Sequence, residues 1–311
     1  MPRGFAACVE VTPACPVEAT TYGYYPSLGP NAALLAVYAV LFFAQIIMGF
    51  MTKVYFFSAA IAAGCFLEAL GYGGRIIMHN NPWSDSGMRI QIVCLIIGPS
   101  FIAGGIYLTL KHFIRLNGPE HSRLRPNLYT WIFIGCDIGS ICLQAIGGGL
   151  AGSAKDNRDL LEAGNNVIIA GIAFQVATMV FCGILTVDYS IRRYRNRAAK
   201  SHIKTKGAGA KAMLFQAGVA FAYLTVLIRC IYRLPEMAGG WGNPRMRNET
   251  EFLILDGLMI ALASATLTIF HPGYFYPYMR TGYVDMSDGT QLSSVELSSP
   301  SIISTDPQNR A

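Results

Sequence analysis

Charged side chains are scarce in this sequence. Only 14% of its 311 residues are Asp, Glu, Lys or Arg, whereas 53% are hydrophobic, and the mean hydropathy is +0.39. Soluble domains carry about 25% charged residues, so this chain does not have enough charge to keep its surface in water. The composition nearly excludes a soluble globular protein and excludes a disordered chain, and it indicates an integral membrane protein.

Several sequence patterns are also missing. The 32 glycines follow no short period, and 8 cysteines are too dilute for a small domain held by disulfides. The five histidines do not cluster with metal-ligand spacing, so we expect no metal site and no cofactor. Neither a G-x-x-x-x-G-K-[ST] phosphate loop nor a G-x-S-x-G motif occurs, so we expect no direct use of ATP and no enzyme activity.

Long hydrophobic runs are the main feature that is present. Crossing a hydrocarbon core of about 30 Å takes roughly 20 apolar residues in a helix, because its backbone groups must bond internally. Seven runs qualify, at residues 31–50, 54–78, 90–110, 128–150, 166–187, 211–234 and 252–270. We predict an all-α fold, an integral membrane bundle of seven transmembrane helices over 31–270, between an N-terminal segment (1–30) and a disordered tail (271–311).

The Lys and Arg residues indicate which way the bundle is oriented. One set of loops and ends holds 15 of them, the other set holds six, and three lie within the spans. Cytoplasmic loops carry the excess of positive charge, so we predict the N-terminus outside and the C-terminus in the cytoplasm. The basic loop at 188–211 is then explained by orientation and by anionic lipid of the inner leaflet, and nucleic acid is not implied.

Two features of the predicted outer side are candidates for modification. Residues 1–30 lack the basic start and cleavage site of a signal peptide, so we expect them to remain on the mature protein. Cys8 and Cys15 share this segment, and a disulfide between them is reasonable in an oxidising compartment. Asn248 begins the only Asn-x-Ser/Thr sequon, although its closeness to the last span argues against glycosylation.

Ionisable and polar residues inside the predicted spans are the candidate functional residues. Each buried charge costs about 2.5–3.5 kcal/mol on insertion scales and requires a partner or a wet cavity. The spacings place each set on one helix face. The sets are Glu68 and Arg75 on the second span, Asp137, Ser140 and Gln144 on the fourth, Arg229, Arg233 and Glu236 on the sixth, and Asp256 on the seventh.

These residues have two interpretations. They could be buried ion pairs that lock helices together, or they could line a polar chamber that opens toward the outer leaflet. Arg229 and Asp256 lie at a similar depth and could pair directly, and the charges concentrate in the outer half. We favour the chamber, because stability alone is a weak reason for so many buried charges. An amine headgroup would be held by Glu68, Asp137 and Asp256, and an anionic one by Arg75, Arg229 and Arg233.

Glycine and proline residues lie close to these polar sets. Gly147, Gly148 and Gly149 follow Gln144 by one turn, and they allow close helix packing or a local break. Gly98-Pro99 is expected to kink the third span. Packing is the favoured role for both.

Several motifs in this order resemble a known family. They are YGYYPS at 22–27, EALGYGGR at 68–75, HNNP at 79–82, the Asp137–Gln144 set with its glycines, RCIYRLPE at 229–236, Asp256 and HPG at 271–273. Over roughly residues 20–275 the chain resembles the fungal lipid-translocating exporter family, seven-helix proteins associated with aminocholesterol resistance. The resemblance implies a fungal protein of the plasma membrane, or of the vacuole or another endomembrane, linked to movement of sphingoid long-chain bases, to drug tolerance or, in one branch, to porphyrin and haem.

The leading hypothesis is therefore a transporter or translocase for an amphipathic, lipid-like molecule, with membrane lipids as the other partner. Seven helices with an external N-terminus are also the architecture of receptors. The sequence lacks the Asp-Arg-Tyr and Asn-Pro-x-x-Tyr motifs of G-protein-coupled receptors, and no lysine in the seventh span could bind retinal. A lipid-responsive receptor and a porphyrin or haem transporter remain the alternatives.

Overall fold

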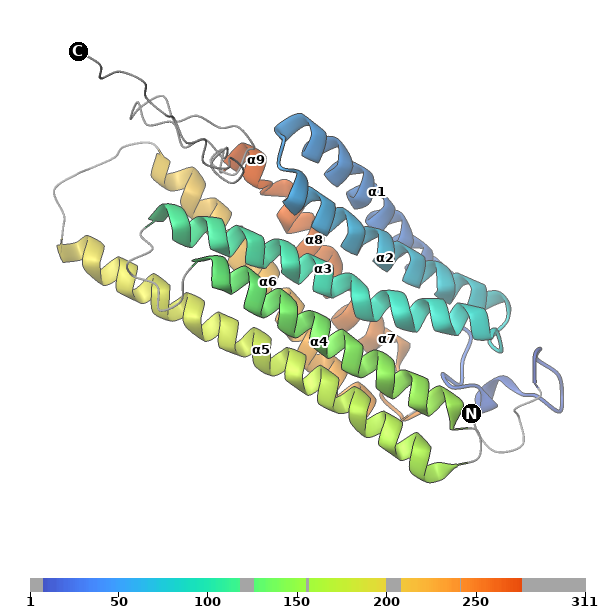
Figure 1. The fold of residues 1–311 in the computed structure, drawn as a ribbon. Coiled ribbons are helices and arrows are strands. Elements are labelled where there is room, and N and C mark those ends of the chain that lie inside the picture. The colour runs from blue at the N-terminus through green and yellow to red at the C-terminus, as the bar shows by residue number, and fades with distance from the viewer. Residues whose placement is uncertain (1–7, 118–125, 155–156, 200–207, 241, 276–311) are drawn as a thin grey trace, which may run out of the picture.

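The computed structural model describes residues 8–117, 126–154, 157–199, 208–240 and 242–275, and these form an elongated helical bundle (Figure 1). The first six long helices are α1 (Leu28–Thr52), α2 (Tyr55–Asn80), α3 (Asp85–Asn117), α4 (Pro126–Ser153), α5 (Arg158–Ala199) and α6 (Ala208–Ala238). The last crossing consists of α7 (Glu249–Phe252), a π-helix η3 (Leu253–Leu258) and α8 (Met259–Ile269). Among the described residues, seven segments are long and apolar enough to cross a membrane, which confirms the predicted seven-helix fold.

The helices extend beyond the predicted spans. For example, α5 has 42 residues, whereas the hydrophobic run predicts a span over 166–187. At 1.5 Å per residue this helix is about 63 Å long, roughly twice the thickness of a hydrocarbon core. Hydropathy marks only the part of a helix that contacts lipid, because helical backbone bonding can continue into the headgroups and water.

The two ends of the bundle differ in what covers them. Residues 8–27, with the short 3₁₀ turn η1 (Val17–Ala19), lie at the end where α1 begins, which we call the N-terminal end of the bundle (Figure 1). At the other end, α9 (Pro272–Phe275) follows α8, and Pro272 and Gly273 are buried. The predicted tail therefore begins too early at 271. The rest of that tail, from 276, and residues 200–207 of the basic loop lie outside the described residues.

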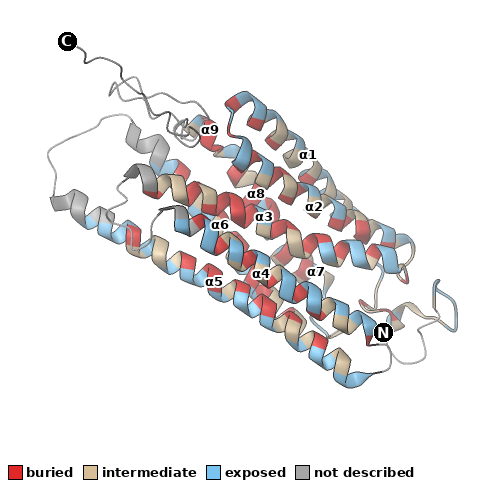
Figure 2. Cartoon of the chain, in the orientation of Figure 1, coloured by how far each residue is buried: buried red, intermediate tan, exposed pale blue. Residues whose placement is uncertain are grey.

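Buried residues follow the inward faces of the helices, and exposed ones face outward (Figure 2). The core contains Tyr38, Phe57, Ile61, Tyr72 and Leu95. The outward faces are also hydrophobic: the side chains of Phe56, Trp131 and Ile184 are 84%, 77% and 60% exposed. An apolar exterior is expected where acyl chains replace water as the solvent, so this surface belongs to an integral, multi-pass membrane protein.

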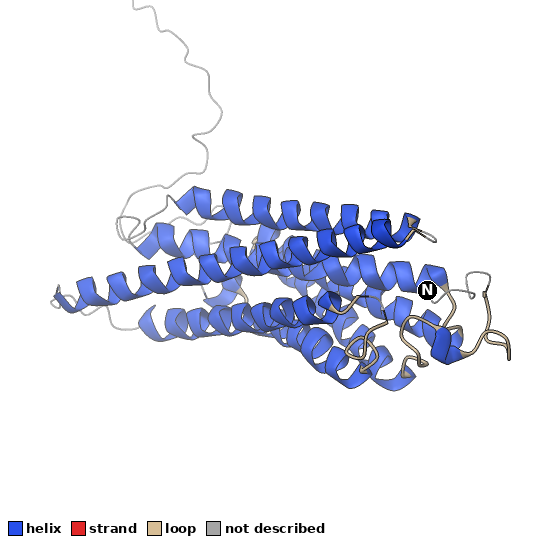
Figure 3. Cartoon of the chain, turned by 90° about the horizontal axis from the view of Figure 1, so that it is seen from below, coloured by secondary structure: helices blue, strands red, loops and turns tan. Residues whose placement is uncertain are grey.

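Helices that are adjacent in the sequence make most of the packing contacts, notably α1 with α2, α2 with α3 and α4 with α5. The helices run side by side along the bundle, as the view from below also shows (Figure 3). Glycines permit the closest approach. A Cβ on Gly147 of α4 would lie 2.7 Å from the carbonyl oxygen of Gly164 on α5 and 2.7 Å from the amide nitrogen of Ile168.

Only the first glycine of the run at 147–149 is needed for this packing. A Cβ on Gly148 meets no atom within 4 Å in the described structure. We expect Gly147→Ala to lower the free energy of unfolding by about 1–3 kcal/mol, because two backbones must separate. Gly148→Ala is the matched control, and it should leave stability unchanged or raise it, because Ala favours a helix by up to about 1 kcal/mol. Titration of the purified protein with SDS measures both, and equal losses would contradict this packing role.

Candidate functional site

Helix α6 presents three charged residues on one face. Arg229, Arg233 and Glu236 are separated by four and three residues, and the Arg233 Nη1 and Glu236 Oε2 atoms are 3.0 Å apart. Asp256 comes from η3, and its Oδ1 atom lies 2.8 Å from Arg229 Nε and 3.1 Å from Arg233 Nε. Arg229, Glu236 and Asp256 are at most 3% exposed. The direct pairing of Arg229 with Asp256, suggested by their similar depth, is therefore present.

Arg229 also supplies a hydrogen bond that α3 lacks. Helix α3 continues through Pro99, which has no backbone N–H to donate to the carbonyl of Leu95, four residues earlier. The Nη2 group of Arg229 donates to that carbonyl oxygen. A freed carbonyl inside a membrane requires such a donor, so Arg229 links α6 both to α3 and to η3.

Asp256 lies within the π-helix η3, a feature that the hydrophobic pattern did not predict. The carbonyl of the next residue, Gly257, accepts a 2.8 Å hydrogen bond from the Tyr38 hydroxyl of α1. Tyr38 stacks on Tyr72 of α2, with ring centroids 5.7 Å apart. Short π-helices are rare and frequently occur at functional sites. This one turns the carboxylate of Asp256 toward the two arginines.

Glu68 lies close to this charged group but does not join it by a hydrogen bond. Its side chain is 1% exposed, and neither carboxylate oxygen has a hydrogen-bond partner in the described part of the chain. Glu68 packs against α3 at Gly98, a residue without a side chain. A Cβ on Gly98 would lie 2.8 Å from Glu68 Oε1. Gly98 therefore makes room for the carboxyl group of Glu68 between α2 and α3.

Arg75 belongs to a different cluster. Its Nη2 atom lies 2.8 Å from Glu249 Oε1 and its Nε donates to Asn31 Oδ1 at 2.7 Å. The guanidinium carbon lies 4.4 Å from the ring centroid of Phe252. Glu249 also accepts hydrogen bonds from the amide (2.9 Å) and hydroxyl (2.6 Å) of Ser27. Arg75 of α2 and its partner Glu249 of α7 thus connect these helices to the N-terminal segment. Asn31 and Glu249 were not predicted from the sequence as partners of Arg75.

The N-terminal segment covers its end of the bundle. A disulfide joins Cys8 to Cys15, and the Trp83 indole donates to the Cys15 carbonyl at 3.2 Å. The hydroxyl of Tyr22 accepts a 2.9 Å hydrogen bond from the Gln91 amide. Burial raises the pKa of Tyr22 to about 12, so this hydroxyl keeps its proton at neutral pH. Nearby, Asn248 caps α7 by accepting from the Glu251 amide, and its glycosylation stays a prediction.

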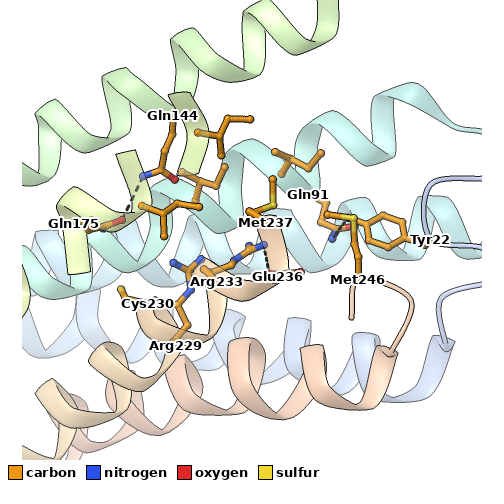
Figure 4. Close-up of a pocket in the computed structure, with 14 residues that line it drawn as sticks. Tyr22, Gln91, Gln144, Gln175, Arg229, Cys230, Arg233, Glu236, Met237 and Met246 are labelled. Carbon is orange, nitrogen blue, oxygen red and sulfur yellow. Dashed lines mark hydrogen bonds and ion pairs between the residues drawn. The ribbon is translucent and has the colours of Figure 1, made fainter. Parts of the chain in front are cut away.

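A pocket lies between α3, α4, α5 and α6, and its empty space, counted together with the open solvent at its mouth, is about 560 Å³. The two guanidinium groups of Arg229 and Arg233 point into it from α6 (Figure 4). Its other lining residues are Glu236 and Cys230, the amides Gln91, Gln144 and Gln175, Tyr22 of the N-terminal segment, and the apolar residues Ile92, Ile96, Ile168, Ile172, Met237 and Met246. Charge, amides and apolar side chains in one cavity suit an amphipathic ligand.

The amides connect the helices that enclose the pocket. Gln144 Nε2 lies 3.4 Å from Gln175 Oε1, and Gln175 Nε2 donates to Ser100 Oγ at 3.1 Å. Gln91 and Gln175, like Tyr22, were not among the predicted site residues. A lone glutamine on an apolar helix was a weak signal, and only Gln144 was predicted because it shares a face with Asp137.

The structure does not bring all eight predicted residues into one chamber. Four of them line the pocket: Gln144, Arg229, Arg233 and Glu236. Asp256 does not line it, but its carboxylate forms ion pairs with both arginines. Glu68, Arg75 and Asp137 are buried elsewhere, outside the pocket lining. The two interpretations of the charges are therefore both represented: Arg75 forms a buried ion pair between segments, and the α6 residues border a cavity.

The fold and this cavity define a class of protein: an integral, multi-pass helical membrane protein with a charged, amide-lined pocket inside the bundle. Comparison of the sequence with known families identifies it further. Residues 61–279 match the model of the RTA1-like protein family, and the chain belongs to that family.

Characterised relatives come from the yeast Saccharomyces cerevisiae. The chain is 33% identical over 309 residues to the sphingoid long-chain base transporter RSB1, covering 88% of this chain and 80% of the relative. It is 26% identical over 207 residues to protoporphyrin uptake protein 1, covering 66% and 65% of the two chains. It is 28% identical over 216 residues to protein RTM1, covering 66% and 64%. No solved structure matches the chain.

Proposed function

We propose that this protein is a transporter that moves an amphipathic, lipid-like molecule across or out of the membrane, with the headgroup in the pocket beside α6. The observation that carries this proposal is the position of Arg229, Arg233 and Glu236 at a cavity whose remaining wall consists mainly of amide and apolar side chains. Charged groups are expensive inside a bilayer and mark substrate pathways. The similarity to a sphingoid long-chain base transporter supports the same conclusion.

The first candidate substrate is an amphiphile with an amine headgroup, such as a sphingoid long-chain base. Glu68, Asp137 and Asp256 do not line the pocket, so Glu236 is the carboxylate that would bind the ammonium group. Its present partner is Arg233, at 3.0 Å. The amine would displace Arg233, whose Nε atom lies 3.1 Å from Asp256 Oδ1, so the guanidinium would still have a counter-charge.

An anionic substrate is the second candidate. Arg229 and Arg233 present two guanidinium groups side by side to the pocket, an arrangement suited to carboxylates. The similarity to the protoporphyrin uptake protein favours this alternative for a molecule with carboxylate groups.

The orientation and the membrane belong to the same proposal. The excess of Lys and Arg in one set of loops supports an external N-terminus. The pocket, which Tyr22 and Met246 border at the N-terminal end of the bundle, would then lie in the outer half of the bilayer. We propose the plasma membrane as the location, with the vacuole or another endomembrane as the alternative.

Transport by proteoliposomes tests the function and the sign of the headgroup together. Wild-type protein is expected to accelerate the movement of a fluorescent long-chain base across the bilayer. Glu236→Gln should slow this movement at least about tenfold, because it removes a charge-assisted hydrogen bond worth about 1.5–3 kcal/mol. Uptake of a dicarboxylic porphyrin should not be slowed by this variant. The matched control is Glu162→Gln, an exposed glutamate on α5. Vesicles that move neither molecule faster than protein-free vesicles would overturn the proposal.

A further inference from the structure

Asp137, near the middle of α4, is buried without a counter-charge. Its side chain is 3% exposed, and neither carboxylate oxygen has a hydrogen-bond partner among the residues that the structure describes. The Tyr107 hydroxyl of α3 faces the carboxyl group of Asp137 and favours its charged form, although the two groups do not meet strict hydrogen-bonding geometry. Such a group is costly to bury, far more so when ionised than when neutral.

The titratable groups that interact electrostatically with Asp137 are tyrosines and cysteines, none of which carries a positive charge. They are Tyr107 from α3, Cys182 from α5, and Tyr223 and Cys230 from α6. The other buried carboxyl groups of the described chain differ in this respect. Asp256 and Glu236 are paired with arginines, and Glu68 lies within the electrostatic reach of Arg229 and Arg233. Asp137 can therefore take up or release a proton without breaking an existing ion pair.

Two connections lead from Asp137 to the pocket. Asp137, Ser140 and Gln144 lie on one face of α4, and Gln144 lines the pocket about 10 Å further along the helix axis. Ser140 is fully buried, and its hydroxyl donates to the backbone carbonyl of Asp137 at 2.7 Å. Cys230 of α6 lies within the electrostatic reach of Asp137 and also lines the pocket.

We propose that Asp137 is a proton-binding site linked to the pocket, so that binding of a cationic headgroup in the pocket releases a proton from Asp137. This inference rests on the proposed function. A cation in the pocket supplies the counter-charge that Asp137 lacks and thereby favours its ionised form. Linkage is reciprocal, so protonation of Asp137 weakens binding of the cation. The released proton passes to bulk water, and a pH gradient becomes the energy source for exchange of protons against an amine.

The test measures proton release on binding. The purified full-length protein is titrated with an N-trimethylated long-chain base, whose fixed charge cannot itself release protons, in weak buffer with a pH indicator. Wild-type protein is expected to release up to one proton per molecule bound, and its affinity should rise with pH by at most about tenfold per unit. Asp137→Asn should bind with an affinity that does not depend on pH and should release no proton.

Two further variants make the result decisive. Asp137→Glu keeps a carboxyl group and should still release a proton. Asp188→Asn is the matched control: Asp188 forms an ion pair with Arg192, and this variant should behave as wild type. Proton release by Asp137→Asn equal to that of wild type would overturn the inference. So would binding and transport by the wild type without proton release, a result that leaves the proposed function intact. A wild type that neither binds nor moves the amine overturns both.

Discussion

Replacing Arg229 with Ala is expected to lower the free energy of unfolding by about 3–5 kcal/mol, the cost of breaking a buried ion pair by removing one partner. The variant removes the Arg229–Asp256 contact at 2.8 Å and the side-chain donor to the Leu95 carbonyl. Titration of the purified protein with SDS, followed by far-UV circular dichroism, measures the loss.

A second substitution separates the two contributions. Pro99→Ala restores a backbone N–H that can bond the Leu95 carbonyl within α3, so the double variant with Arg229→Ala should recover about 1–3 kcal/mol. The matched control is Arg89→Ala, because Arg89 is an exposed arginine on α3 and lies 3.7 Å from Asp85. Exposed ion pairs contribute little, so its stability should change by less than about 1 kcal/mol. If Pro99→Ala gives no recovery, Arg229 does not serve α3 in the way that the structure indicates.

Filling the pocket should have the largest effect on transport. Ile172 of α5 lines the cavity and is 5% exposed. Ile172→Trp places an indole among the other pocket residues, Ile168, Cys230 and the α6 arginines. We expect the transport rate of the labelled long-chain base to fall at least about tenfold, which corresponds to a loss of about 1.4 kcal/mol or more of binding free energy. The fluorescence assay in proteoliposomes measures the initial rate.

The same helix provides the control for this experiment. Ile184, also on α5, is 60% exposed on the outer face, where acyl chains would contact it. Ile184→Trp adds the same indole outside the pocket, so its transport rate should equal that of wild type. Equal rates for both variants, with Ile172→Trp still folded, would mean that the substrate does not use this pocket.

The fold was predictable because the membrane imposes a simple rule on the sequence. Each run of about 20 apolar residues predicted one crossing, and the described part of the chain contains seven such helical segments. The first and last residues of the helices were less predictable, as the extra length of α5 and the helical turn of Pro272–Phe275 show. Hydropathy measures contact with lipid, whereas a helix ends where its backbone hydrogen bonding ends.

The candidate site was predictable in its charged residues and less so in their arrangement. Helical spacing and depth predicted the pairing of Arg229 with Asp256. They did not predict the π-helix around Asp256, because its hydrophobic pattern resembles that of an ordinary helix. They also missed Glu249 as the partner of Arg75, because Glu249 lies in a polar segment before the last crossing and 174 residues away.

Glycines and amides were ambiguous for a different reason. Gly147 and Gly148 are neighbours in the same run, yet only Gly147 faces α5 closely enough to require the absence of a Cβ. Gln91 and Gln175 line the pocket, although each is a single amide on an apolar helix. Which face of a transmembrane helix meets which neighbour depends on tertiary packing, and one sequence does not determine it.

The most direct test of the account asks where the headgroup of a transported amphiphile binds. A long-chain base with a photoreactive group beside its amine is cross-linked to the protein in membranes, and the labelled peptides are identified by mass spectrometry. The account predicts labelling of pocket residues of α5 and α6, among them Ile168, Ile172 and Met237, that excess unlabelled base prevents. Labelling confined to outward-facing side chains such as Phe56 and Trp131, with the pocket residues unmodified, would contradict it.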